Sequence, residues 1–210
     1  MAAPLDLEQR IGAGRLRVVE STRALVETVA GVGPDVDDDA LARAAAAVEA
    51  ATAALVDAGA APTAGRPRTA HYGDFLPHSL LVGQAHPLSP AATYTVTDGV
   101  LEVRVRFGAV YEGPPGCVHG GIVALAFDEL FGMCNVVNGR GGLTGRLSVR
   151  YRTPTPLHRE LRMTAWPVHR EGRRMRLHGT VHADDVLTAD AEGLFVVPRV
   201  PLRDGPGRDA

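Results

Sequence analysis

The pattern of apolar and polar positions divides the chain into a helical N-terminal part and a longer part with strand-like alternation. Up to about residue 58, apolar residues recur at helical spacing in two stretches, which Gly31–Pro34 separates. The aspartates Asp37–Asp39 complement the helix dipole at the start of the second stretch. We therefore expect a helical hairpin over residues 1–62, which packs on the core, stabilises a dimer or covers a site.

Residues 63–90 predict an irregular segment. The composition from Gly59 to Thr69, with its proline and glycine, is typical of a linker. The histidines His71, His78 and His86 follow at irregular spacing, which matches no metal-ligand template. We therefore expect no metal site in this segment.

From Ala92 onward the residues alternate as they do in β-strands. Thr93–Thr97 and Val100–Phe107 flank an Asp-Gly pair, which is typical of a tight hairpin turn. In the second strand the odd-numbered positions are apolar and the even-numbered ones charged, so one face should be buried. Four more alternating segments follow, at 143–152, 161–168, 173–183 and 187–197. We expect these four strands in meander order.

One apolar run without strand alternation lies between the hairpin and the later strands. Ile122–Met133 is apolar nearly all round a helix, which indicates a buried helix rather than a surface one. Asn138 and Gly139 should end it. A helix wrapped by an antiparallel sheet is the α+β arrangement that we predict for residues 91–198, followed by a tail at 199–210.

Composition narrows the class of protein. The formal net charge of −2 over 210 residues gives no basic surface for nucleic acid. We found no apolar run that approaches the roughly 20 residues of a membrane span, and we expect no signal peptide. Cys117 and Cys134 lack the spacing of a disulfide scaffold, which fits a reducing compartment. We expect a cytoplasmic protein that binds neither nucleic acid nor membrane.

The start of the apolar helix has the features of a carbonyl-binding site. At His119-Gly120-Gly121 the first helical N–H groups have no intrahelical partner, so they can hold negative charge on a carbonyl oxygen, although a tight turn explains the same residues. Asp128 lies eight residues beyond Gly120, which is about 12 Å along a helix. The two groups can meet at one carbon only if two subunits share a site. Otherwise Asp128 is an inert hydrogen-bond acceptor.

These residues carry a resemblance to a known family. The loop Glu112–Gly121, the acid at Asp128, the hydroxyl at Thr144 and the strand end Val149–Pro154 resemble the hotdog-fold acyl-CoA thioesterases. The sequence is most similar to the PaaI-like branch that includes the mammalian mitochondrial long-chain acyl-CoA thioesterases. The similarity runs from about residue 87 to residue 197 and leaves the N-terminal helices out.

The resemblance implies a role for each matching residue of the loop and helix. Asp128 would activate water or attack the thioester carbonyl of an acyl-CoA. The backbone N–H of Gly120, from the other subunit, would polarise that carbonyl. His119 would orient the loop and the bound thioester, and Thr144 would hold the acid or its water.

The resemblance also implies how substrate and subunits are bound. Gly121 would lie against the substrate, and Arg150 and Arg152 would meet the CoA phosphates, although arginines on the wet face of a strand are often only solvated. No cofactor and no metal are implied. The expected assembly is a homodimer or a dimer of dimers with shared active sites.

Two positions differ from the simplest version of this pattern. Some family members carry an asparagine six residues before the motif histidine, where this chain has Gly113. Glu129 is a second acid, but on a helix it points about 100° away from Asp128. We expect Glu129 to make a structural or interface contact.

Other functions were weighed against thioester hydrolysis. A Cys–His hydrolase with Cys117 and His119 would lack a third, orienting group. A metal site from His178 and His182 would place two strand residues about 13 Å apart. A non-catalytic acyl-CoA-binding protein and a dehydratase on the same fold stay open as alternatives. The sequence does not define the acyl chain.

Overall fold

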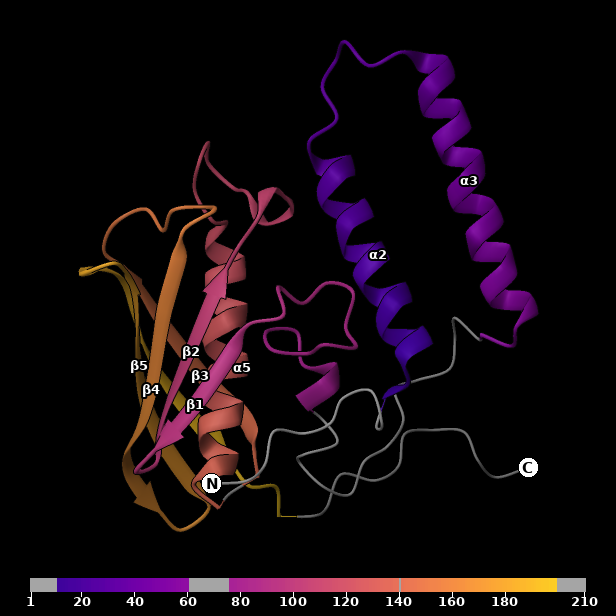
Figure 1. Cartoon of the computed structure of the whole chain (residues 1–210). Coiled ribbons are helices and arrows are strands. Elements are labelled where there is room, and N and C mark those ends of the chain that lie inside the picture. The colour runs from indigo at the N-terminus through magenta and orange to yellow at the C-terminus, as the bar shows by residue number, and fades with distance from the viewer. Residues whose placement is uncertain (1–10, 61–75, 140, 200–210) are drawn as a thin grey trace.

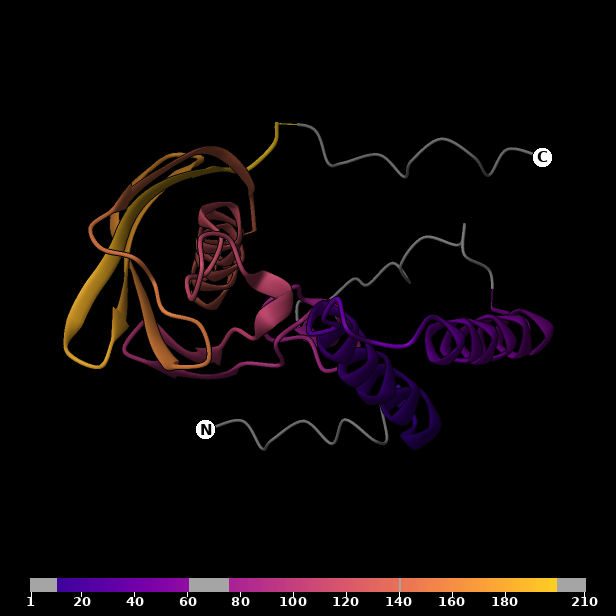
Figure 2. The same cartoon turned by 90° about the horizontal axis from the view of Figure 1, so that it is seen from above.

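The computed structural model describes residues 11–60, 76–139 and 141–199, and its centre is one long helix inside a curved sheet (Figure 1). The helix is α5, Gly120–Val137. The six strands are β1 Thr93–Thr97, β2 Val100–Arg106, β3 Leu143–Tyr151, β4 Glu160–Glu171, β5 Arg174–Ala183 and β6 Val186–Val196. Seen from above, the sheet curls around α5 (Figure 2). The predicted α+β arrangement is confirmed.

The order of the strands corrects the expected meander. The antiparallel sheet has the order β1-β2-β4-β5-β6-β3, so β4, β5 and β6 form a meander but β3 lies at the far edge beside β6. After β3 the chain crosses beneath the loop at the helix start, where Val118 N–H donates to Thr155 O and Leu157 N–H to Gly116 O. Alternation fixes which face of a strand is buried, but not which strand lies next to it.

The first hairpin forms as its sequence predicts. Asp98 and Gly99 both have positive φ, 50° and 78°, as the two central residues of a type I′ turn require. Leu101, Val103 and Val105 are buried on the inner face of β2. The charged positions between them face outward.

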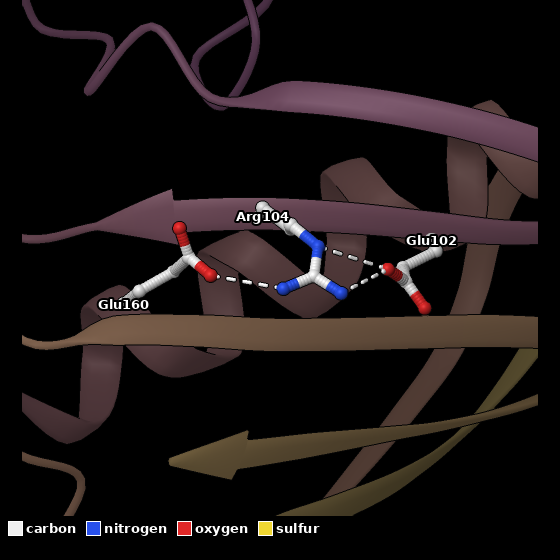
Figure 3. A network of polar contacts seen from close by, with 3 residues as sticks. All are labelled: Glu102, Arg104 and Glu160. Carbon is white, nitrogen blue, oxygen red and sulfur yellow. Dashed lines mark hydrogen bonds and ion pairs between the residues drawn. The ribbon is translucent and has the colours of Figure 1, made fainter. Parts of the chain in front are cut away.

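The outer face of the same hairpin carries a small ion-pair network (Figure 3). Arg104 reaches Glu102 of its own strand at 3.0 Å and Glu160 of β4 at 2.9 Å. The hydrogen bond that Arg104 donates to Glu160, together with the charge of Glu102, raises the pKa of Arg104 above its ordinary value. Because the network is exposed, it adds little to stability and mainly keeps this face charged.

Helix α5 packs so closely on the sheet that two strand positions must be glycine. The ring of Phe131 is fully buried against β5 and β6. A Cβ on Gly179 would lie 2.8 Å from that ring, and a Cβ on Gly193 would lie 2.5 Å from it. The two glycines therefore form a notch in the sheet that receives the helix.

The composition of α5 also matches a membrane-spanning segment. Among the described residues, it is the one helix long and apolar enough to cross a membrane, with a mean hydropathy of 1.5. A helix at the centre of a sheet-wrapped core has the same composition. Eight of its residues are buried in this fold, so the core accounts for its apolarity.

Two N-terminal helices lie on the open side of the curl (Figure 2). They are α2, Ala13–Ala30, and α3, Asp38–Asp57, and they confirm the two predicted N-terminal helices. Asp37 caps α3 by accepting the N–H of Ala40 at 2.9 Å. α3 buries none of its residues and projects away from the sheet, whereas α2 lies against the core (Figure 1).

Polar contacts fix α2 to the chain around the sheet. The Arg23 guanidinium donates to the carbonyl oxygens of Gly83 and His86, at 2.6 and 2.9 Å. Glu27 accepts the N–H of Ala109 at 2.9 Å, at the start of the 3-10 turn that precedes the Glu112–Gly121 loop. α2 is therefore bonded to the segment that leads into the predicted site.

The irregular segment before the sheet belongs to the core. Residues 61–75, which include most of the expected linker and His71, lie outside the described residues. From Leu76 the chain packs against α5, with Ser79 and Leu81 fully buried. This segment covers the side of α5 that the sheet leaves open.

We expect Gly193→Ala to destabilise the fold, because the added methyl group must displace the Phe131 ring. Overpacking of this kind typically lowers the free energy of unfolding by about 1–3 kcal/mol, and urea denaturation would measure the change. Gly141→Ala is the matched control, since a Cβ there meets nothing within 4 Å. Equal stability of the two variants would contradict the notch.

Candidate active site

The Glu112–Gly121 loop is closed on itself before the helix begins. The Glu112 carboxylate accepts the N–H of Gly116 at 2.7 Å, and Gly113 N–H donates to Cys117 O at 2.9 Å. At the end of the loop, His119 N–H donates to Tyr111 O at 2.9 Å. These bonds hold the loop as a compact turn that delivers His119 to the start of α5.

His119 is the N-cap of α5. Its Nδ1 accepts the N–H of Gly121 at 3.0 Å, which satisfies one of the free donors at the helix start. Because Nδ1 accepts, the proton of the neutral ring lies on Nε2. The structure thus shows His119 as the cap of the helix start, and its role in orienting a thioester stays a prediction.

The first residue of the helix also has a free donor. The N–H of Gly120 has no acceptor among the described residues. The carbonyl oxygen of the same residue accepts the hydroxyl of Tyr151, in β3, at 2.8 Å. A free N–H at a helix N-terminus is suited to a carbonyl oxygen that gains negative charge.

The second half of the site lies further along the helix. Asp128 is half-buried, and its Oδ1 accepts the hydroxyl of Thr144 at 2.6 Å. Thr144 lies in β3 beside a bulge between Thr144 and Arg146, which shifts the register of the strand at this point. The strand therefore holds one oxygen of the carboxylate.

Asp128 and Gly120 do not converge within one chain. Both lie on the single continuous helix Gly120–Val137, and eight helical residues span about 12 Å. The structure thus holds two separate groups on α5, Gly120 with His119 at its start and Asp128 with Thr144 further along.

Glu129 has a separate and structural role. Its carboxylate accepts the Ser79 hydroxyl at 2.6 Å and the Leu80 N–H at 3.2 Å. It thus binds α5 to the irregular segment on the open side, which confirms that Glu129 makes a structural contact.

Arg150 lies on the outer face of β3, and Arg152 directly follows the last residue of the strand. Arg152 Nε is 2.5 Å from Asp190 Oδ1 in β6, and this hydrogen bond lowers the pKa of Asp190 below its ordinary value. Arg150 is exposed and lies opposite Asp190 in the strand register. A phosphate near Arg152 would compete with Asp190 for the guanidinium.

The position of Gly113, where the expected pattern has an asparagine, has no room for a side chain. A Cβ at this position would lie 2.7 Å from the Cα of His119. Any side chain would therefore push the histidine away from the helix start. The glycine lets the loop pass directly over the residue that caps α5.

The alternative with Cys117 as nucleophile has no support in the geometry. The Cys117 thiol donates to Pro115 O at 3.6 Å, and His119 Nδ1 is occupied by the Gly121 N–H. Across the described ranges, no group of three or more His, Cys, Asp or Glu side chains is placed to hold a metal ion.

Sequence reasoning did not identify two polar contacts at this site. The alternation at 143–152 puts Tyr151 on the same side as Leu147 and Val149, which pack on the core, but it does not indicate the bond to Gly120. Ser79 lay in the segment without periodicity, so no pattern pointed to its bond with Glu129.

Comparison with known proteins agrees with this geometry. The sequence model of the Thioesterase superfamily matches residues 115–189. The crystal structure of a thioesterase superfamily protein is 30% identical, with a TM-score of 0.77, and the match covers 88% of this chain and 96% of that one. The chain therefore belongs to the thioesterase superfamily, and the predicted hotdog fold is confirmed.

Curated relatives match part of the chain. Acyl-coenzyme A thioesterase THEM4 of Xenopus laevis is 33% identical over 91 residues, which cover 42% of this chain and 41% of the relative. Acyl-coenzyme A thioesterase THEM5 of Homo sapiens is 30% identical over 91 residues, 42% of this chain and 37% of the relative. The chain thus spans about two fifths of the length of these relatives.

We expect Ser79→Ala to destabilise the fold because it removes a buried hydroxyl from the Glu129 carboxylate. Leaving a buried polar group with one partner fewer typically reduces the free energy of unfolding by about 1–3 kcal/mol. Chemical denaturation would measure the loss. Ser21→Ala, at an exposed position of α2, is the matched control and should change stability little.

Proposed function

We propose that this protein is an acyl-CoA thioesterase, which hydrolyses the thioester bond of an acyl-CoA to a free acid and CoA. The observation that carries the proposal is the pair of half-sites on α5. One offers an unoccupied N–H at Gly120, and the other offers a carboxylate, Asp128, that Thr144 holds by one oxygen. The names of the curated relatives, acyl-coenzyme A thioesterases, support the substrate class.

Hydrolysis of a thioester requires a hydrogen-bond donor to its carbonyl oxygen and a base or nucleophile near its carbonyl carbon. The Gly120 N–H would hydrogen-bond the thioester oxygen and stabilise the oxyanion that forms. Asp128 would act in one of two ways. It would take a proton from a water molecule while the water oxygen attacks the carbonyl carbon, or its own carboxylate would attack that carbon. The C–S bond then breaks, and CoA leaves as the thiolate and takes up a proton. If water attacked, the acyl group departs directly as the acid. If Asp128 attacked, a water molecule then hydrolyses the anhydride between Asp128 and the acyl group, which releases the acid and restores the carboxylate.

A dimer is part of the proposal, because the two half-sites can meet only between subunits. The outer edge of β3 supports it, since β3 ends the sheet and its outer backbone row has no partner strand in the described chain. Such an edge is a template for pairing with another strand. β3 also carries Thr144 and Tyr151, so a second copy that approaches this edge would bring half-sites together. The assembly would be a homodimer or a dimer of dimers.

Substrate binding and location complete the proposal. Arg150 and Arg152 would meet the phosphates of CoA, and Gly121 would allow close approach of the acyl carbonyl. Both cysteines are free thiols, which fits the reducing cytoplasm. The alternatives are an acyl-CoA-binding protein without catalysis and a dehydratase.

Asp128→Asn tests the catalytic assignment. We expect kcat for thiol release from acyl-CoA to fall by roughly 10²–10⁴-fold, because the amide can neither accept the proton nor attack. The control is Asp185→Asn, in the exposed β5–β6 turn. Undiminished hydrolysis by the pure variant would refute the role of Asp128. A wild-type protein that binds acyl-CoA without releasing thiol would favour the binding protein.

Gly120→Pro tests the N–H donor. Proline lacks the N–H yet suits the first helical position, and His119 already has the φ of −59° and ψ of 133° that a residue before proline adopts. We expect a loss of roughly 10²–10³-fold in kcat. Gly120→Ala, which keeps the N–H, should lose much less.

Mixing the two inactive variants tests whether subunits share the site. Co-expression of Gly120→Pro with Asp128→Asn should give mixed dimers in which one of the two sites is intact. With random pairing in a two-fold dimer, activity should return to roughly a quarter of wild type. If activity stays at the level of the separate variants, the site is not shared.

A further inference from the structure

We propose that Tyr151 is a positioning residue for thioester hydrolysis, which holds the Gly120 backbone so that its N–H points at the substrate carbonyl. The inference rests on the proposed function. Tyr151 would not touch the reacting atoms. It would act through the peptide next to the donor.

The geometry fixes the Gly120–Gly121 peptide at both ends. Its carbonyl oxygen accepts the Tyr151 hydroxyl at 2.8 Å, and its N–H donates to His119 Nδ1 at 3.0 Å. The preceding peptide carries the donor N–H, and its oxygen, on His119, accepts from Ile122 and Val123 at 2.9 and 3.1 Å. The donor therefore lies between two planar units that are each held in place.

Two adjacent glycines make this support necessary. Glycine has more accessible backbone conformations than other residues, so a Gly-Gly step at a helix start is the easiest place for the chain to rotate. The same absence of side chains gives a substrate access to the Gly120 N–H. The hydrogen bond from Tyr151 restrains the rotation without closing that access.

Tyr151 is placed by a rigid element. It pairs with Ala189 in the register between β3 and β6, and the next residue, Arg152, donates its N–H to Thr188 O at 2.8 Å. The ring lies over Gly120, where a Cβ would be 3.5 Å from ring carbons. The strand thus transmits its position to the helix start.

The surroundings of Tyr151 fit a role in the bound state. The residue is 53% exposed, so in the free chain water competes for its hydroxyl. A substrate or partner subunit that excluded this water would strengthen the hydrogen bond to Gly120. β3 would then support both half-sites of its chain, through Thr144 at one end and Tyr151 at the other.

Tyr151→Phe removes the hydroxyl and keeps the ring. We expect kcat for thiol release to fall roughly tenfold, with KM and the melting temperature close to wild type, because binding and packing are retained. Tyr94→Phe is the matched control, since Tyr94 lies in β1 at the other edge of the sheet and its side chain is also exposed. A rise in KM alone, or a kcat equal to wild type, would overturn the inference.

A double-variant comparison shows whether Tyr151 acts through the donor. If it does, Tyr151→Phe should have no further effect on kcat once Gly120→Pro has removed the N–H. Equal fold-losses in both backgrounds would mean that Tyr151 acts independently of Gly120, and the inference would fail.

Binding of CoA analogues separates this inference from the proposed function. A CoA analogue with a tetrahedral, negatively charged oxygen at the carbonyl position mimics the oxyanion that Gly120 would bind, whereas an S-alkyl CoA presents no oxygen there. Tyr151→Phe should weaken the oxyanion analogue roughly tenfold relative to the S-alkyl compound, and an unchanged ratio would refute the inference. If wild type releases no thiol but shows this change in ratio, the hydrolysis proposal fails and the positioning role stands.

Discussion

The fit of α5 into the curved sheet is the constraint on which the rest of the structure depends. Burial of an almost wholly apolar helix is the main driving force for wrapping the sheet around it. That burial requires a close approach, because Phe131 fills space that side chains on Gly179 and Gly193 would occupy. Once this contact is made, the rotation of the helix about its axis and its position along that axis are set. The directions of Asp128 and Glu129 and the place of the Gly120 N–H follow from it.

The fixed helix also explains why the chemistry is divided. A straight helix cannot bring residues eight positions apart to one atom, so in the proposed function the donor and the acid of one chain would serve different sites of an assembly. Each half is supported by the same strand, with Thr144 bonded to Asp128 and Tyr151 bonded to Gly120. β3 is one of the two edges of the sheet, so the strand that bonds to both groups also has an edge that a second subunit could reach.

Much of this could be predicted from sequence because the signals are local. The Asp98-Gly99 turn, the alternation through Leu101–Phe107 and the apolar helix each depend on neighbouring residues. The position of β3 in the sheet could not be predicted, since its pairing with β6 depends on how the chain passes the Glu112–Gly121 loop after β3. The loop motif and Asp128 were found through spacing and resemblance. The bond from Tyr151 was missed, because alternation gives the face of a side chain but not its partner.

The bond between Glu129 and the Ser79 segment bears on the choice between two consecutive acids. If α5 turned by one residue, Glu129 would face Thr144 and the strand would still meet a carboxylate. The opposite side would change, because Leu130 would then face the Ser79 hydroxyl and the Leu80 N–H that now bind an acid. The segment before the sheet thus fixes which residue of the helix faces β3. It keeps Asp128, the shorter of the two acids, beside Thr144 and so sets how far the carboxylate reaches.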